Sequence, residues 1–201
     1  TKQSAKLVYS RSRKASGKEQ KAMNPLRDNA ISSISDSLVY ENAKPQMTKL
    51  PDGRILLTYL DDTVSGAGGQ TTLMYRIYEN GSWGEAVPVN FTGRLDTAAK
   101  VKVHQDRVWL LYENSDVAIT EDMEAAGIAG HMKLYAVEFL PGTDRFLTPV
   151  LLGENNPGYK YGYDFMEGEG ELSCVWAENN ADDILLDSGS TKIYKSSYQN
   201  G

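Results

Sequence analysis

The fold of this chain is decided by residues 45–89, which read PQMTKLPDGRILLTYLDDTVSGAGGQTTLMYRIYENGSWGEAVPV. In this stretch four short apolar segments alternate with turn motifs. Pro51-Asp52-Gly53 indicates a tight turn, because proline presets the first turn residue and glycine accepts a positive φ at little cost. Asn80-Gly81 is the strongest short-range indication of a β-hairpin. The pattern predicts four antiparallel strands, over residues 47–50, 54–60, 72–78 and 83–89.

The same order of segments recurs twice further along the chain. Two landmark positions recur in each copy. The alternative explanation for this recurrence is chance similarity among unrelated strands. The landmarks are Tyr59, Tyr112 and Trp176 in the second strands, and Tyr75, Tyr135 and Tyr194 in the third strands. Repeated units of four antiparallel strands are typical of β-propeller blades. We therefore predict an all-β fold of β-propeller-type repeats with four-stranded antiparallel blades, about three of them plus a partial one.

The strand pattern divides one propeller-like domain into four parts. We expect a partial blade and a polar loop over residues 1–43, blades over residues 44–95 and 96–156, and an incomplete blade over residues 157–201. This number of blades is below the roughly four to eight that close a propeller. We therefore expect the chain to belong to a larger propeller, completed by further blades or domains of a parent protein.

Composition excludes some classes of function. The formal net charge of −6 argues against a nucleic-acid partner, because nucleic-acid binders usually carry a basic patch. With Cys174 as its one cysteine, the chain cannot form an internal disulfide. The sequence contains no apolar run long enough to span a membrane. The predicted partners are therefore a glycan or a protein.

Acidic and amide side chains follow the second strand of every predicted blade. They are Asp61, Asp62, Glu113, Asn114, Asp116, Glu178, Asn179, Asp182 and Asp183. In a propeller these positions would gather at one rim. Oxygen ligands suit calcium, and carboxylate and amide groups suit sugar hydroxyls. The alternative is that these residues bond their own backbone in turns. We predict a rim that binds a ligand or Ca²⁺, and no other cofactor.

Aromatic residues alternate in the segment GYKYGYDF, at the start of the third predicted blade. Tyr159, Tyr161, Tyr163 and Phe165 would place four rings on one face of an inner strand. Such rings can pack on the apolar faces of sugars, and the alternative is buried packing between blades. We take the three tyrosines as candidate ligand contacts.

No catalytic residue is assigned from the sequence. His104 and His131 have no Ser, Cys or second His at a spacing typical of a triad or metal site. A glycosidase needs only two carboxylates, but choosing two in an acidic chain would be arbitrary. Whether the protein is an enzyme stays open; a non-catalytic role is favoured, and a glycoside hydrolase is the alternative.

The segment YRIYENGSWGEAVPV, residues 75–89, resembles the strand, turn and strand around the Asp-box of sialidase-like bacterial β-propellers. Asn80-Gly81-Ser82-Trp83 carries the resemblance, while the usual leading Ser-x-Asp is absent. The family's catalytic set has no assigned counterpart in this sequence, so the resemblance implies a degenerate, non-catalytic member.

Together these patterns predict a non-catalytic propeller module of a secreted or cell-surface bacterial protein that binds glycan or protein. An extracellular or cell-surface location follows from that prediction. The alternative is part of a glycoside hydrolase or sialidase whose catalytic set is completed elsewhere in the parent chain.

Overall fold

The structure is a computed structural model that describes residue 34 and residues 43–62, 70–120, 122–154, 158–168, 170–180 and 189–198. The chain divides into two compact units, Thr1–Ile34 and Ser35–Gly201, and every strand and helix described below belongs to the second. Most of the partial blade expected over residues 1–43 lies outside the described residues. Within them, no helix has the length and apolar character needed to cross a membrane.

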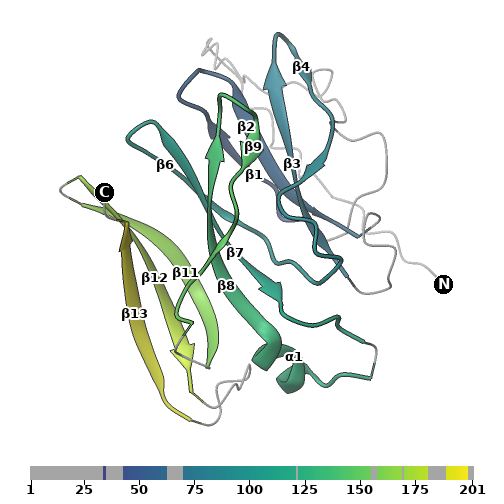
Figure 1. Ribbon diagram of the computed structural model, residues 1–201, viewed down its shortest axis with the longest axis vertical. Coiled ribbons are helices and arrows are strands. Elements are labelled where there is room, and N and C mark those ends of the chain that lie inside the picture. The colour runs from purple at the N-terminus through teal and green to yellow at the C-terminus, as the bar shows by residue number, and fades with distance from the viewer. Residues whose placement is uncertain are drawn as a thin grey trace, which may run out of the picture. The chain divides into compact units, whose positions relative to one another are not determined.

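Three antiparallel sheets follow one another along the chain (Figure 1). The first contains β1 (Gln46–Lys49), β2 (Ile55–Asp61), β3 (Thr72–Glu79), β4 (Ser82–Trp83) and β5 (Val87–Pro88). The second contains β6 (Lys100–His104), β7 (Arg107–Ser115), β8 (Met132–Leu140), β9 (Arg145–Phe146) and β10 (Val150–Leu151). The third contains β11 (Tyr159–Gly168), β12 (Glu171–Asn179) and β13 (Thr191–Tyr198). The short helix α1 (Ala125–His131) connects β7 to β8. The predicted all-β fold with blade-like sheets is confirmed.

The fourth strand of the first two sheets is broken into two short pieces. β4 and β5 both pair with β3, and β9 and β10 both pair with β8. Pro88 and Pro149 lie in or beside these edge segments, where proline is tolerated because the missing N–H faces away from the sheet. The continuous fourth strands predicted from the sequence are thus interrupted by short non-strand segments.

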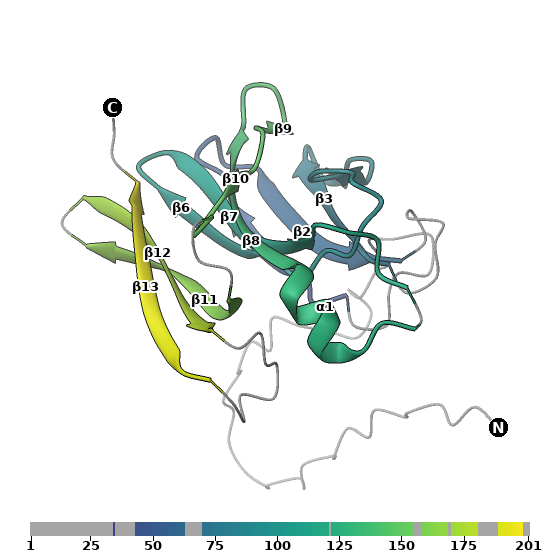
Figure 2. The same cartoon turned by 60° about the horizontal axis from the view of Figure 1, so that its bottom comes forward.

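The sheets lie side by side in chain order (Figures 1 and 2), and their first strands are neighbours. β1 contacts β6, and β6 contacts β11. The first strands therefore form one inner wall, while the short fourth-strand pieces lie at the opposite edge of the first two sheets.

Apolar side chains cover both faces of the second sheet. Leu110 belongs to a buried cluster with Leu73 of the first sheet, which we call the first interface. The next residue, Leu111, belongs to a separate cluster with Trp176 of the third sheet, which we call the second interface. Successive side chains of a strand point to opposite faces, so β7 supplies both clusters. Each fully buried leucine of this kind stabilises the fold by about 1.5–3 kcal/mol.

The strand register corrects one correspondence drawn from the sequence. Tyr112 lies opposite Tyr135, and Trp176 lies opposite Tyr194. In the first sheet Tyr59 lies opposite Met74, so the matching position there is Met74 and not Tyr75. A shift of one residue moves a side chain to the other face of a sheet. Tyr75 accordingly packs in the first interface, where its hydroxyl donates a 2.8 Å hydrogen bond to the Asp144 carbonyl of the second sheet.

The predicted Asn80-Gly81 turn joins β3 to β4. Asn80 has φ 51° and Gly81 has φ 85°, as a turn with two left-handed residues requires. The β6–β7 hairpin instead turns at Gln105 and Asp106, which both have positive φ without being glycine.

Candidate functional site

Most of the acids and amides expected at an exposed rim are buried in the ends of the second strands. Asp61, Glu113, Asn114, Glu178 and Asn179 are all buried. Asp62 and Asp116 are exposed, while Asp182 and Asp183 lie outside the described residues. Repetition thus brings polar groups to the same end of each second strand, but inside the protein. A polar group in that place needs a partner or a function.

Several of these predicted residues have structural partners. Asn114 Nδ2 donates a 2.7 Å hydrogen bond to Asp96 Oδ1, and Asp96 Oδ2 accepts a 2.7 Å bond from the Leu73 backbone N–H. Asp96 therefore links the first sheet to the second. Burial raises the pKa of Asp96 to about 7, although the two hydrogen bonds act to lower it. Asp116 lies 2.7 Å from His131 Nδ1 at the surface.

Glu178 is part of a buried group in the third sheet. Its Oε2 lies 3.6 Å from Lys160 Nζ and accepts a hydrogen bond from Trp176 Nε1 at 3.3 Å. Its Oε1 accepts one from the Gly158 N–H, also at 3.3 Å. Lys160 is 2% exposed, so both charges of the pair are enclosed in protein. A paired buried charge of this kind is tolerated, whereas removal of one partner is strongly destabilising.

Glu113 differs from its neighbours because one carboxyl oxygen has no partner. Its side chain is buried, and Oε1 accepts no hydrogen bond from any residue that the structure describes. Burial raises the pKa of Glu113 to about 8, while the charge of Lys160 opposes the increase. At pH 7 the carboxyl group is therefore mostly protonated, and it can donate a hydrogen bond as well as accept one.

Glu113 lines a pocket of about 680 Å³ along the first strands of all three sheets, which we call the inner pocket. The other lining residues come from segments at or next to these strands, and they are Lys44, Gln46, Thr97, Ala98, Ala99, Lys100, Tyr159, Gly162 and Tyr163. The size is within the range of small-molecule sites. The inner pocket is where the structure brings aromatic rings, hydrogen-bonding groups and an unpartnered carboxyl together.

A β-bulge separates the tyrosines that the sequence placed on one face. Tyr161 lies opposite Ala177, but the register then shifts and Asp164 lies opposite Val175. Gly162, inside the bulge, has φ +59° and so takes a conformation that glycine adopts readily. The prediction that four rings share one face is therefore wrong.

The consequences of the bulge differ for the three candidate tyrosines. Tyr159 and Tyr161 stack with their ring centres 5.6 Å apart, and the Tyr161 hydroxyl lies 3.1 Å from Thr191 Oγ1. Tyr163 turns into the second interface, where its hydroxyl lies 2.9 Å from Thr97 Oγ1 and donates to the Ala98 carbonyl at 3.1 Å. Tyr159 and Tyr163 still reach the inner pocket.

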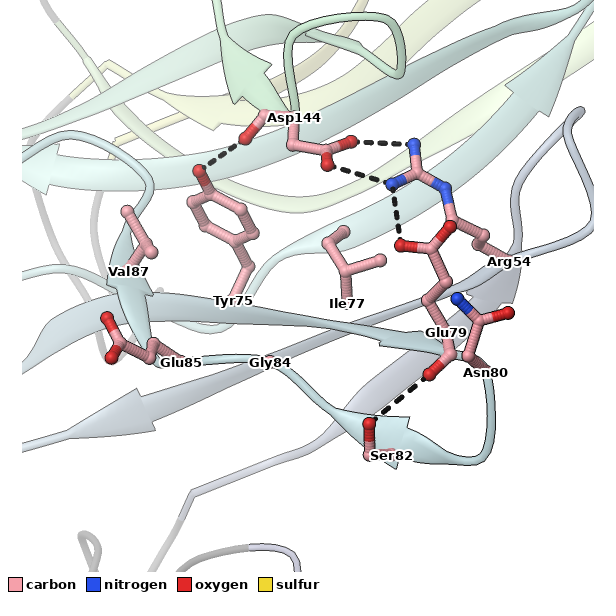
Figure 3. A pocket seen from close by; sticks show the side chains of 10 residues that line it. All are labelled: Arg54, Tyr75, Ile77, Glu79, Asn80, Ser82, Gly84, Glu85, Val87 and Asp144. Atoms are coloured by element: carbon pink, nitrogen blue, oxygen red, sulfur yellow. Dashed lines mark hydrogen bonds and ion pairs between the residues drawn. The ribbon is translucent and has the colours of Figure 1, made fainter.

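A second pocket, of about 390 Å³, lies where the first and second sheets meet, and we call it the outer pocket (Figure 3). Arg54 points from the first sheet to Asp144 of the second, with contacts of 2.8 and 2.6 Å to the two carboxylate oxygens. Asp52 also binds the Arg54 guanidinium, at 2.8 Å. These carboxylates raise the pKa of Arg54, with Asp144 as the larger cause. The cation of the outer pocket is thus already paired.

The predicted calcium site has no support among the residues that the structure describes. In this part of the chain, no three His, Cys, Asp or Glu side chains lie close enough to hold a metal ion. For Asp182 and Asp183, which lie outside the described residues, calcium binding stays a prediction.

Sequence reasoning missed the basic residues of the inner wall. Lys44 and Lys100 line the inner pocket, and the charge of Lys160 acts on the pKa of Glu113. Lysine is common on surfaces, so nothing in its spacing marks these three. The alternation of Tyr159, Lys160 and Tyr161 is the one sequence pattern that indicates a basic residue there, because it places a charge between two rings of a predicted inner strand.

Comparison with known proteins places the chain in no family. No model of a known protein family matches it, and no curated protein matches its sequence. Among solved structures, the α-L-arabinanase of Penicillium chrysogenum in complex with arabinobiose is similar to it, with a TM-score of 0.44 and 13% identity. The alignment covers 73% of this chain and 44% of the arabinanase, so the chain spans less than half the length of that structure. The resemblance to sialidase-like propellers stays a prediction.

Proposed function

We propose that the chain is a propeller-type module that binds carbohydrate in the inner pocket. The observation that carries the proposal is the meeting of Tyr159 and Tyr163 with the unpartnered carboxyl of Glu113 in one pocket. Aromatic rings pack on the apolar faces of sugars, and a carboxyl group bonds their hydroxyls. A concave site of this size suits a glycan better than a protein surface. A secreted or cell-surface location in a bacterium stays a prediction.

A glycan array with the intact chain tests this proposal. We expect binding to at least one class of glycan, and we expect Tyr159→Ala to weaken it at least tenfold, as loss of a stacked aromatic contact does. Tyr78→Ala is the matched control, because Tyr78 packs on Trp83 and lines neither pocket. Failure of the wild-type chain to bind any glycan contradicts the proposal, as does equal loss of binding in both variants.

A glycoside hydrolase is the second candidate, and Glu113 is the observation in its favour. A carboxyl group that keeps its proton at neutral pH is suited to general-acid catalysis. Hydrolysis also needs a second carboxylate across the substrate. Among the described residues that line the inner pocket, Glu113 is the one carboxyl group. The enzyme would therefore need its second carboxylate from a residue outside this set.

Turnover of fluorogenic glycosides by the intact chain separates the two candidates. The binding module predicts no release of fluorophore by the wild-type chain. Release that Glu113→Gln abolishes, and that Glu85→Gln in the outer pocket leaves unchanged, would instead establish the hydrolase.

A further inference from the structure

The charges that line the inner pocket are unequal. Lys44 and Lys100 are the cations among its described lining residues, and Glu113 is the carboxyl group. Both lysines are exposed, and neither ammonium group makes a hydrogen bond or an ion pair with a described residue. Lys160, by contrast, is buried beside Glu178. The two lysines of the wall therefore remain available to a ligand.

The surroundings of Glu113 do not cancel this excess of positive charge. On β11 the titratable groups near Glu113 are Lys160, Tyr159 and Tyr163. Burial raises the pKa of both tyrosines, so both stay uncharged at pH 7. Glu178 of β12 forms an ion pair with Lys160 and balances that charge. On β8, the residue opposite Glu113 is the uncharged Leu134.

Among the ammonium and carboxyl groups of the inner pocket, hydrogen-bond donors consequently outnumber acceptors. The two ammonium groups can only donate. The protonated carboxyl of Glu113 adds a third donor, whereas the Tyr163 hydroxyl is occupied by Thr97 and Ala98. A ligand that matches this wall presents several acceptor oxygens and a negative charge. A neutral sugar, in which every hydroxyl is also a donor, matches it less well.

We infer that the inner pocket binds an acidic oligosaccharide, whose carboxylate or sulfate group contacts Lys44 and Lys100 while the Glu113 carboxyl donates a hydrogen bond to a second oxygen of the ligand. This inference rests on the proposed function, because it names the class of carbohydrate that the same site takes. Carboxylate and sulfate share the required chemistry, which is a delocalised negative charge over acceptor oxygens.

Calorimetric titration of the intact chain with charged and uncharged partners of one ligand tests the inference. The first pair is trigalacturonate and its methyl ester, and the second is a sulfated carrageenan tetrasaccharide and its desulfated form. At pH 7 and low salt we expect the acidic member of at least one pair to bind about tenfold more tightly, since each exposed ion pair adds up to about fivefold. Added salt should reduce this preference.

Substitution of the wall lysines assigns the preference to the inner pocket. Lys44→Gln and Lys100→Gln should each weaken the acidic ligand by up to about fivefold and leave the uncharged partner unchanged. Lys49→Gln is the matched control, because Lys49 is exposed in β1 but does not line the inner pocket. An equal effect of all three substitutions would mean general attraction by surface charge, and would overturn the inference.

The pH dependence tests the part assigned to Glu113. Between pH 7 and pH 9 the protonated fraction of a group with pKa about 8 falls about tenfold, and affinity for the acidic ligand should fall with it. Glu113→Gln keeps a donor at this position, so the pH dependence should disappear in that variant. Unchanged affinity across this range in the wild-type chain contradicts the role of Glu113.

The outcomes separate this inference from the proposed function. Equal binding of both members of every pair, lost in Tyr159→Ala, would leave carbohydrate binding in place and overturn the preference for acidic ligands. Binding of only uncharged glycans would have the same meaning. Absence of binding to the acidic ligands and to every glycan on the array would overturn both.

Discussion

The two interfaces of the second sheet bury different kinds of side chain. The first interface is a large apolar cluster, and its buried carboxyl, Asp96, accepts hydrogen bonds from Leu73 and Asn114. The second interface has a smaller apolar cluster, and beside it Glu113 keeps an oxygen without a partner. Buried polar groups are nearly always hydrogen-bonded, and exceptions concentrate at functional sites. The larger cluster makes the first interface the main source of stability, and the second interface is the one whose unpartnered carboxyl lines the inner pocket.

Phe139→Ala should have the largest effect on stability, because it opens a cavity in the first interface. Phe139 is fully buried, and its ring centre lies 5.9 Å from that of Tyr75 and 5.0 Å from that of Phe146. We expect the free energy of unfolding to fall by about 3–5 kcal/mol in urea denaturation. Ile193→Ala is the control at an 82% exposed position, and it should cost under about 0.5 kcal/mol. Similar losses in both variants would remove the distinction between core and surface.

Glu113→Gln should change how stability depends on pH. Below pH 4.5, which is the ordinary pKa of a glutamate, Glu113 is protonated in both the folded and the unfolded chain. Between 4.5 and about 8 the folded chain keeps a proton that the unfolded chain releases, so stability falls as pH rises. The Gln variant should gain relative to wild type by up to about 1.4 kcal/mol per pH unit in this window. Parallel stability curves for the two proteins between pH 5 and pH 8 would contradict the burial of an acidic proton.

Gly158→Ala should disturb the third sheet, where space beside the end of β12 is limiting. An added Cβ would lie 2.4 Å from the Asn179 carbonyl oxygen and 2.9 Å from Glu178 Cγ. We expect a loss of about 1–3 kcal/mol of stability, as overpacking causes. Gly168→Ala is the matched control in β11, because nothing lies within 4 Å of its added Cβ. Equal tolerance of the two substitutions would contradict the close approach at Gly158.

A double-mutant cycle of Arg54→Ala and Asp144→Ala should give the smallest effect. The pair joins the first and second sheets through two contacts, but Asp144 is nearly half exposed. We expect a coupling free energy of about 1 kcal/mol that decreases with added salt. A coupling near zero would show that this ion pair adds nothing to the stability of the first interface.

The sequence predicted the strands well, because each has an apolar run between turn residues. Pro51-Asp52-Gly53 and Asn80-Gly81 located two hairpins, and the second-strand landmarks Tyr59, Tyr112 and Trp176 all lie in second strands. The register between paired strands was harder to predict from the sequence. Nothing in Met74-Tyr75 shows which residue lies opposite Tyr59, since both are apolar enough for either face.

The candidate site was predicted less well than the fold, for two physical reasons. A β-bulge at Gly162 places Tyr161 and Tyr163 on different faces, and a glycine within an alternating pattern indicates such a shift only weakly. The sequence predicts the rim acids to be turn or surface groups, whereas Glu113 and Glu178 are buried. Burial of that kind depends on residues far apart in the sequence, such as Lys160 for Glu113.

The most direct test of the account is the titration of the Glu113 carboxyl carbon by ¹³C NMR, with Glu113→Gln used to assign the signal. We predict a midpoint near pH 8, far above the ordinary value of 4.5, because the group is buried without a hydrogen-bond partner for Oε1 among the described residues. A midpoint near 4.5 would show that Glu113 is solvated or paired, and would contradict both the contrast between the interfaces and the donor role proposed for it.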